Sequence, residues 1–295
     1  MQTIEGIKRQ IDNIEDLLSV VKTMKTLAAI NIRQYERAVE ALDDYNRTIE
    51  LGFQVLLHQQ SNEILPVRST PHNDLGAIIF GSDHGMCGQF NEQITTFSME
   101  ELSRLGVSRS HRTILSLGAR ITAYLEAEGQ PLDEAWSIPG SVTGITPLVQ
   151  DIVLKIDAWR TQRDVDRILL FYNRPLSGAA YRPYVFRLLP VNWERFGRLA
   201  RREWPSRMLP MFSMDWQPLL SALQRQYFFV SIYRAFAESL MSENASRLAT
   251  MQSAERNIQE HLEDLNTLFH QQRQHSITEE LLDIIAGFET LTGKE

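Results

Sequence analysis

The chain contains a single cysteine, Cys87. One cysteine excludes an internal disulfide framework and a zinc site built on several cysteines. The chain has no uninterrupted apolar run of about 18 residues, so we expect no transmembrane helix. Its first residues carry acids and lack an apolar core, which argues against a signal peptide and a transit peptide. These absences favour exposure to the cytoplasm.

A net positive charge is also lacking, because 37 acidic residues outnumber 30 lysines and arginines and give a formal net charge of −7. Generic nucleic-acid binding needs a basic face that neutralises phosphates, so we expect no nucleic-acid partner. Hydrophobic residues make up 43% of the 295 positions, which suits a folded protein of one or two domains.

Proline is absent from the first 65 residues. Apolar residues recur there in alternating steps of three and four, with breaks only at Lys25 and Asn46. A sustained repeat of 3.5 residues predicts a left-handed coiled coil, in a helix roughly 80 Å long. The apolar members of this seam are Ile4, Ile7, Ile11, Ile14, Leu18, Val21, Ala28, Ile32, Tyr35, Val39, Leu42, Ile49, Phe53 and Leu56.

The C-terminal segment mirrors this pattern, with no proline or glycine between Pro218 and Gly287. We predict one helix of roughly 100 Å that ends near Gly287 or at the later Gly293. The two terminal helices could pair antiparallel. The apolar members of the second seam are Leu223, Tyr227, Val230, Ala237, Met241, Leu248, Met251, Ile258, Leu262, Leu265 and Phe269.

Polar residues interrupt both seams. They could fix the register between the two helices, or mark points where the coil faces another protein. Ordinary tolerated polarity is the third interpretation. These residues are Lys25, Asn46, Arg234, Asn244 and Glu255.

The middle of the chain follows a different pattern, in which β-rich runs alternate with helical ones. Such alternation predicts βαβ units and a mainly parallel sheet. Pro183 places the last strand at the sheet edge. Strands are expected at 75–82, 113–119, 167–173 and 181–190, and helices at 88–105, 118–128 and 145–162.

The predicted fold class is therefore α/β, as a Rossmann-like domain inserted between two long helices that form an antiparallel coiled coil. The expected boundaries are 1–60 for the N-terminal helix, 75–212 for the α/β domain and 213–295 for the C-terminal helix.

The loop GSDHGMCGQFN at 81–91 follows the first predicted strand. Its glycines, Gly81, Gly85 and Gly88, fit neither the dinucleotide fingerprint nor the P-loop, and no lysine follows. A phosphate could still bind amides at the start of the next helix. The alternative is structural, since glycine permits positive φ and a close approach of loop and helix.

The same loop contains Asp83, His84 and Cys87. Cysteine and histidine could form a nucleophile and its base, but no orienting partner is evident, so a small buried thiol is the simpler interpretation. Asp83 and His84 are too few to hold a metal. No motif supports an enzyme active site. The arginine cluster at 193–207 could meet an acidic partner or lipid headgroups, although a solvated linker is simpler.

Four stretches now carry a resemblance to a family. The family of gamma subunits of F-type ATP synthases has a loop close to GSDRGLCGGFN, which matches here at Gly81, Ser82, Asp83, Gly85, Cys87, Gly88, Phe90 and Asn91. The stretches SENASRLATM (242–251) and 265–291 resemble its C-terminal pattern. The stretch MKTLAAINIRQYERA (24–38) resembles its N-terminal pattern MxMVAAxKxRxA.

The resemblance implies a central rotor shaft without catalytic residues, cofactor, metal or direct small-molecule substrate. The coiled coil would enter a hexamer of alternating alpha and beta subunits, where the beta subunits catalyse. The α/β domain, with its signature loop, would meet the epsilon subunit and the membrane ring of c subunits. The chain would then be a peripheral protein at the cytoplasmic face of a bacterial or archaeal plasma membrane.

The resemblance also implies contacts with the beta-subunit loops that catch the shaft. Arg273, Gln274 and Thr278 carry these contacts, and Met24 and Lys25 lie on the facing part of the N-terminal helix. Arg273 could bind a carboxylate with two hydrogen bonds.

The chain departs from the family pattern at EDLLSVV (15–21), where the family has NT-x-KIT, and at His84 and Gln89. These departures suggest a divergent branch, such as a second ATPase in its host. Two other functions remain open: a nucleotide-binding enzyme with helical arms, and a stand-alone coiled-coil scaffold that forms homodimers.

Overall fold

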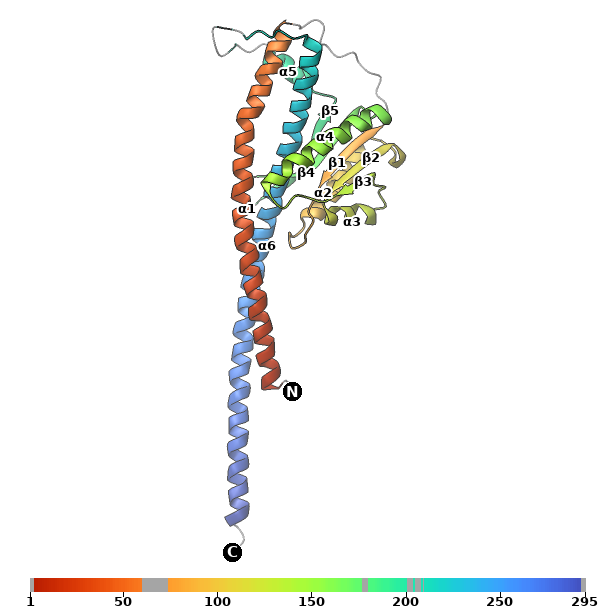
Figure 1. The fold of residues 1–295 in the computed structure, drawn as a ribbon. Coiled ribbons are helices and arrows are strands. Elements are labelled where there is room, and N and C mark those ends of the chain that lie inside the picture. Colours follow the sequence, from red (N-terminus) through yellow and green to blue (C-terminus); the bar gives the residue numbers. More distant parts are fainter. Residues whose placement is uncertain are drawn as a thin grey trace. The chain divides into compact units, whose positions relative to one another are not determined.

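Two long helices begin and end the chain, and a sheet with shorter helices lies between them in sequence (Figure 1). The structure, a computed structural model, describes residues 3–59, 74–176, 180–200, 204, 208 and 210–292. The chain divides into two compact units, one of residues 1–27 with 248–295 and one of residues 28–247. Each unit is described by itself.

The long helices are α1 (Ile4–Gln59) and α6 (Trp216–Thr292). Every predicted seam position of α1, and of α6 as far as Phe269, is buried or half-buried. In α1 as far as Ile49, and in α6 beyond Thr250, most neighbours in sequence are exposed, so the 3.5-residue repeat identified the buried face there. From Tyr227 to Leu248 every residue of α6 is buried or half-buried, because this part of the helix also packs in the α/β core. Burial of such apolar side chains stabilises a fold by about 1.5–3 kcal/mol per fully buried residue.

The direction of pairing follows from hydrogen bonds between the helices in the second unit. Partner numbers fall along α6 as they rise along α1, so the helices are antiparallel, as predicted. The pairs are Asn31–Asn244, Asp43–Arg234 and Tyr45–Gln226.

Most polar seam residues form such interhelical pairs, which supports their role in register. In the first unit, Lys25 of α1 forms an ion pair with Glu255 of α6. Asn46 is the exception, because its amide donates to Glu50 of the same helix at 3.3 Å.

Helix α6 continues through Gly287 and ends at Thr292, directly before Gly293, so the later of the two predicted ends is confirmed. From the Lys25–Glu255 pair, the first turn of α1 reaches about residue 276 of α6 in an antiparallel register. Beyond that level α6 extends past the start of α1 (Figure 1). Its large apolar side chains there are exposed: Ile277, Leu281, Leu282, Ile284 and Ile285.

The sheet has five strands in the order β3-β2-β1-β4-β5. The first four are parallel and β5 is antiparallel to β4, so the prediction of a mainly parallel sheet is confirmed. Pro183 lies in β5, at the edge, as expected. The bounds are Leu75–Phe80 for β1, Arg112–Leu117 for β2, Glu134–Trp136 for β3, Arg167–Pro175 for β4 and Tyr181–Leu189 for β5.

Helices cover both faces of this sheet. On one face, Ala77 and Ile79 of β1 pack in a core with α2 (Phe90–Arg104) and α3 (Ala119–Ala127). On the other face, Ile78 and Phe80 pack in a core with α4 (Ile145–Gln162) and α6. Alternate residues of one buried strand therefore serve two cores, which is why β1 reads as a continuous apolar run.

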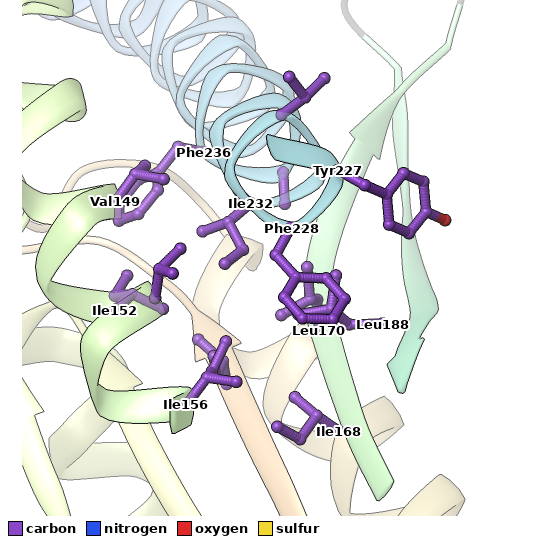
Figure 2. Close-up of a cluster of buried hydrophobic side chains, with 14 of the residues drawn as sticks. Val149, Ile152, Ile156, Ile168, Leu170, Leu188, Tyr227, Phe228, Ile232 and Phe236 are labelled. Atoms are coloured by element: carbon purple, nitrogen blue, oxygen red, sulfur yellow. The ribbon is translucent and has the colours of Figure 1, made fainter. Parts of the chain in front are cut away.

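Figure 2 shows how α6 joins the second of these cores. Side chains of α4 and α6 point toward one another above β4 and β5, so α6 is part of the α/β core as well as of the helix pair. The labelled residues are Val149, Ile152, Ile156, Ile168, Leu170, Leu188, Tyr227, Phe228, Ile232 and Phe236.

The arginine-rich stretch is not a solvated linker in its first half. Residues Trp193–Ala200 form helix α5, whose Phe196 is fully buried. The Phe196 ring lies 4.5 Å from the Phe53 ring of α1 and 5.4 Å from the Tyr227 ring of α6, centroid to centroid. Most of 201–207 lies outside the described residues.

The core position of α4 is testable with a matched pair of substitutions. Ile152 is fully buried, whereas Leu154 on the same helix is 65% exposed. We expect Ile152→Ala to lower the free energy of unfolding by about 2–5 kcal/mol, because it leaves a cavity. Leu154→Ala should change it by no more than about 0.5 kcal/mol. Urea unfolding followed by tryptophan fluorescence measures both, and equal losses would contradict this packing.

Candidate functional site: a glycine-rich loop against helix α6

The loop between β1 and α2 is closed by its glycines. Gly88 has a φ of 56°, a conformation that glycine adopts without strain. A β-carbon on Gly81 would lie 2.2 Å from Cβ of Ile121 in α3, so only glycine fits between loop and helix. Both observations confirm the structural interpretation of these glycines.

Ser82 and Asn91 close the loop from the inside, and both are buried. The Ser82 amide donates to Oδ1 of Asn91 at 3.0 Å, and Nδ2 of Asn91 donates to the Ser82 hydroxyl oxygen at 2.7 Å. The Ser82 hydroxyl donates to the carbonyl oxygen of His84 at 2.9 Å. These polar groups are therefore used within the loop.

Asp83 ties the loop to two neighbouring segments. Its carboxylate accepts from the amide of Ala119, at the start of α3, at 2.8 Å and from the amide of Ile138 at 2.9 Å. A helix N-terminus favours negative charge, and here the protein supplies that charge itself. The start of α3 is thereby occupied by a carboxylate of the loop itself.

Cys87 is 2% exposed. Its thiol sulfur lies 3.6 Å from the Ser82 hydroxyl and from Nδ2 of Asn91, and it donates to the carbonyl oxygen of His84. Burial raises the pKa of the thiol, so Cys87 stays protonated at neutral pH. A nucleophile needs the opposite, a lowered pKa, so the buried-thiol interpretation is confirmed.

The outer side of the loop lies against α6. The hydroxyl of Ser246 donates to the carbonyl oxygen of Cys87 at 2.6 Å. Nη2 of Arg247 donates to the carbonyl oxygen of Gly85 at 3.4 Å. Tyr181 of β5 completes the contact, with its hydroxyl 3.4 Å from that of Ser246.

A second connection joins the same part of α6 to the end of β4. The Ser242 hydroxyl lies 2.9 Å from the carbonyl oxygen of Asn173 and 2.8 Å from that of Glu238 in its own helix, so its single proton is shared between two acceptors. The side-chain amide of Asn173 in turn donates to the carbonyl oxygen of Phe90, the first residue of α2, at 3.0 Å. The loop 81–91, strand β4 and helix α6 are therefore joined by hydrogen bonds in the same region of the domain.

A buried ion pair lies on this face of α6. Arg247 pairs with Glu243 at 2.6 Å, and both side chains are nearly buried. Burial raises the pKa of Glu243, while Arg247 acts in the opposite direction. Burial, helped by the Glu243 charge, also raises the pKa of Tyr35 in α1 to about 12. Tyr35 therefore stays neutral beside this pair.

The residues expected to contact other subunits lie elsewhere, in the first unit. Arg273, Gln274 and Thr278 are exposed within two turns of α6, and the Thr278 hydroxyl donates to the Gln274 carbonyl oxygen at 2.9 Å.

Met24 and Lys25 are half-buried. Because Lys25 pairs with Glu255, these two residues lie roughly 27 Å along α6 from Arg273. The expectation that they face the Arg273 turn is therefore wrong.

Comparison with known proteins decides what this architecture belongs to. A gamma chain of ATP synthase from Nostoc punctiforme is 25% identical, with 99% of this chain and 100% of the relative aligned. The chloroplastic gamma subunit of ATP synthase from Zea mays is also 25% identical, over 99% of this chain and 90% of the relative. The family model described as ATP synthase matches residues 3–291.

The chain belongs to the ATP synthase gamma-chain family. Solved structures with the same fold include the central stalk of the mitochondrial ATP synthase of Tetrahymena thermophila. That match has a TM-score of 0.58 and 18% identity, over 80% of this chain and 99% of the other. The rotor of the Euglena gracilis enzyme matches with a TM-score of 0.61 and 14% identity, over 93% of this chain and 98% of the other.

The chain is therefore the central-stalk rotor subunit of an F-type ATP synthase and is not itself catalytic. The nucleotide-binding enzyme and the stand-alone scaffold are thereby set aside. No group of acidic, histidine or cysteine side chains suited to a metal ion occurs among the described residues. None of the described helices has a segment long and apolar enough to span a membrane.

Sequence reasoning gave no role to Ser242, Ser246 and Arg247, although it quoted them in a gamma-family motif. The motif match was the available signal, because the contacts join residues 69 to 162 positions apart in the chain.

The state of Cys87 is testable by alkylation. We expect iodoacetamide at pH 8 to modify the native chain more than about tenfold slower than the urea-unfolded chain, since burial lowers the thiolate fraction. Met86→Cys in a Cys87→Ser background is the control, because Met86 is 61% exposed. Alkylation of native Cys87 as fast as in urea, with no fall toward pH 6, would indicate an activated thiol.

Proposed function

We propose that the helix pair turns inside a hexamer of alternating alpha and beta subunits, while the α/β domain meets the epsilon subunit and the membrane ring of c subunits. Ion flow through the ring would turn the chain, and the chain would set the state of each catalytic beta subunit by its angle. Coupling between distant sites through a rigid element with different orientations is a known mode of allostery.

The observation that supports this proposal most is the exposed end of α6. A long helix with apolar side chains beyond the reach of its partner is costly in water, so such a surface indicates a binding site. An enclosing ring of subunits would cover it on all sides. The apolar side chains at 277–285 fit this role.

We further propose that the beta-subunit loops that catch the shaft contact Arg273, Gln274 and Thr278 at one level of α6, and Met24 and Lys25 at the level of Glu255. Arg273 is exposed, so its guanidinium is available to a carboxylate of the partner. Residues 1–60 and 213–295 would then form the shaft, and residues 75–212 the α/β domain. The matched central-stalk and rotor structures support this placement by analogy.

The chain would work as a peripheral protein at the cytoplasmic face of a bacterial or archaeal plasma membrane. It would belong to a divergent branch of the family, in a host that also carries a standard ATP synthase. Two observations favour divergence. Identity to the relatives is near 25%. In addition, the stretch EDLLSVV at 15–21 departs from the family pattern.

Coexpression with the alpha and beta subunits of the same gene neighbourhood tests the proposal. A tag on this chain should recover both subunits with ATPase activity. Arg273→Ala with Gln274→Ala should lower the rate of ATP hydrolysis about tenfold, because charge-assisted hydrogen bonds are lost.

Gln93→Ala with Arg104→Ala, two exposed positions on α2, is the matched control and should leave the rate unchanged. Recovery of this chain without alpha and beta would overturn the rotor proposal. Recovery of only the host's standard alpha and beta subunits would overturn the divergent-branch proposal alone.

A further inference from the structure

The contacts of Ser242, Ser246 and Arg247 raise the question of what the α/β domain needs from α6. Chain connections join this domain to the helices at Gln59 of α1 and Trp216 of α6. The three residues lie roughly 40–45 Å along α6 from Trp216. These residues therefore attach the α/β domain to α6 at a point far from Trp216, where the chain itself connects the two.

Between these two points, apolar packing holds α6 on the sheet (Figure 2). Hydrophobic contact is not directional, so it holds α6 against the sheet but does less to fix the angle between them. Hydrogen bonds are directional, and buried ones are costly to break. The bonds from Ser246 to Cys87 and from Ser242 to Asn173 are both buried. They fix the angle of α6 against the loop and against β4.

The loop 81–91 is braced by hydrogen bonds, so it can transmit a force to the rest of the domain. Its own hydrogen bonds close it through Ser82 and Asn91, and Asp83 joins it to α3 and to Ile138. A force on the Cys87 carbonyl is thereby shared among several segments of the domain. On the helix side, Asn244 continues the connection to Asn31 of α1.

We propose that Ser242, Ser246 and Arg247 are positioning residues that transmit rotation between the helix pair and the α/β domain. They hold the loop 81–91 and Asn173 in a fixed orientation on α6 when the rotor turns against resistance. The proposal gives the loop 81–91 a mechanical role in place of ligand binding. It rests on the proposed contact of the α/β domain with the membrane ring.

The test uses Ser242→Ala with Ser246→Ala in the assembled complex in inverted membrane vesicles. Alanine favours helix and leaves the Arg247–Glu243 ion pair intact. The variant removes the bonds to Cys87 and Asn173, together with the Tyr181 contact of Ser246 and the bond of Ser242 to Glu238 in its own helix. Ser221→Ala is the matched control, because Ser221 lies exposed on the same helix. ATP hydrolysis and ATP-driven ion uptake are measured on the same vesicles.

We expect hydrolysis to stay within about twofold of the wild type, while ion uptake per ATP hydrolysed falls about threefold or more. Amide exchange in 82–91 should become about tenfold faster in the variant and unchanged in the control. If the double variant does not assemble, Ser246→Ala alone carries the same comparison.

Unchanged uptake per ATP would overturn the proposal. Equal losses of hydrolysis and uptake in an assembled complex would also overturn it, because they indicate a general structural role. A wild-type complex that hydrolyses ATP without ion uptake would instead overturn the proposed contact with the ring.

Discussion

The burial of one apolar seam on each terminal helix is the constraint on which the rest of the structure depends. Each helix is too long to hide its seam in a local core, so the two ends of the chain must come together. The sheet between them in sequence is then held where the paired helices meet it. The same helix α6 serves the seam and the α/β core, which couples the two parts physically.

The loop 81–91 is rich in glycine, as phosphate-binding loops are, but its residues join neighbouring elements of the fold. Gly81 is needed because Ile121 approaches its α-carbon, and Asp83 supplies the negative charge that the start of α3 favours. Cys87 contributes its backbone carbonyl to α6, while its thiol is buried and protonated. Gly81, Ser82, Asp83, Cys87 and Asn91 all make contacts within the fold, which agrees with a non-catalytic rotor subunit.

The sequence predicted the features that depend on burial along one element. The 3.5-residue repeat identified the seams, and the apolar run of β1 identified a strand covered on both faces. Helix α4 was predicted at its observed bounds, 145–162. The polar seam residues predicted the register between α1 and α6, because a polar side chain is tolerated in an apolar seam when the other helix supplies its partner.

Features that depend on contacts between distant elements were not predictable. Helix α5 looked like a linker because its arginines dominate, and only Phe53 and Tyr227 show why Phe196 is buried. Strand β3 is three residues long and has no apolar run. An apolar repeat predicts which face of each helix is buried, but not the register of one helix along the other. The sequence therefore placed Lys25 opposite Arg273, whereas it lies opposite Glu255.

Observation of single immobilised complexes tests the central claim, that helix pair and α/β domain turn as one rotor. The hexamer would be fixed to a surface, and a probe would be attached to a cysteine introduced at the exposed Tyr124 of α3. The account predicts rotation of the probe in one direction while ATP is present, and its arrest when ATP is removed. A probe that stays fixed, or that moves without direction, while the same complexes hydrolyse ATP would contradict it.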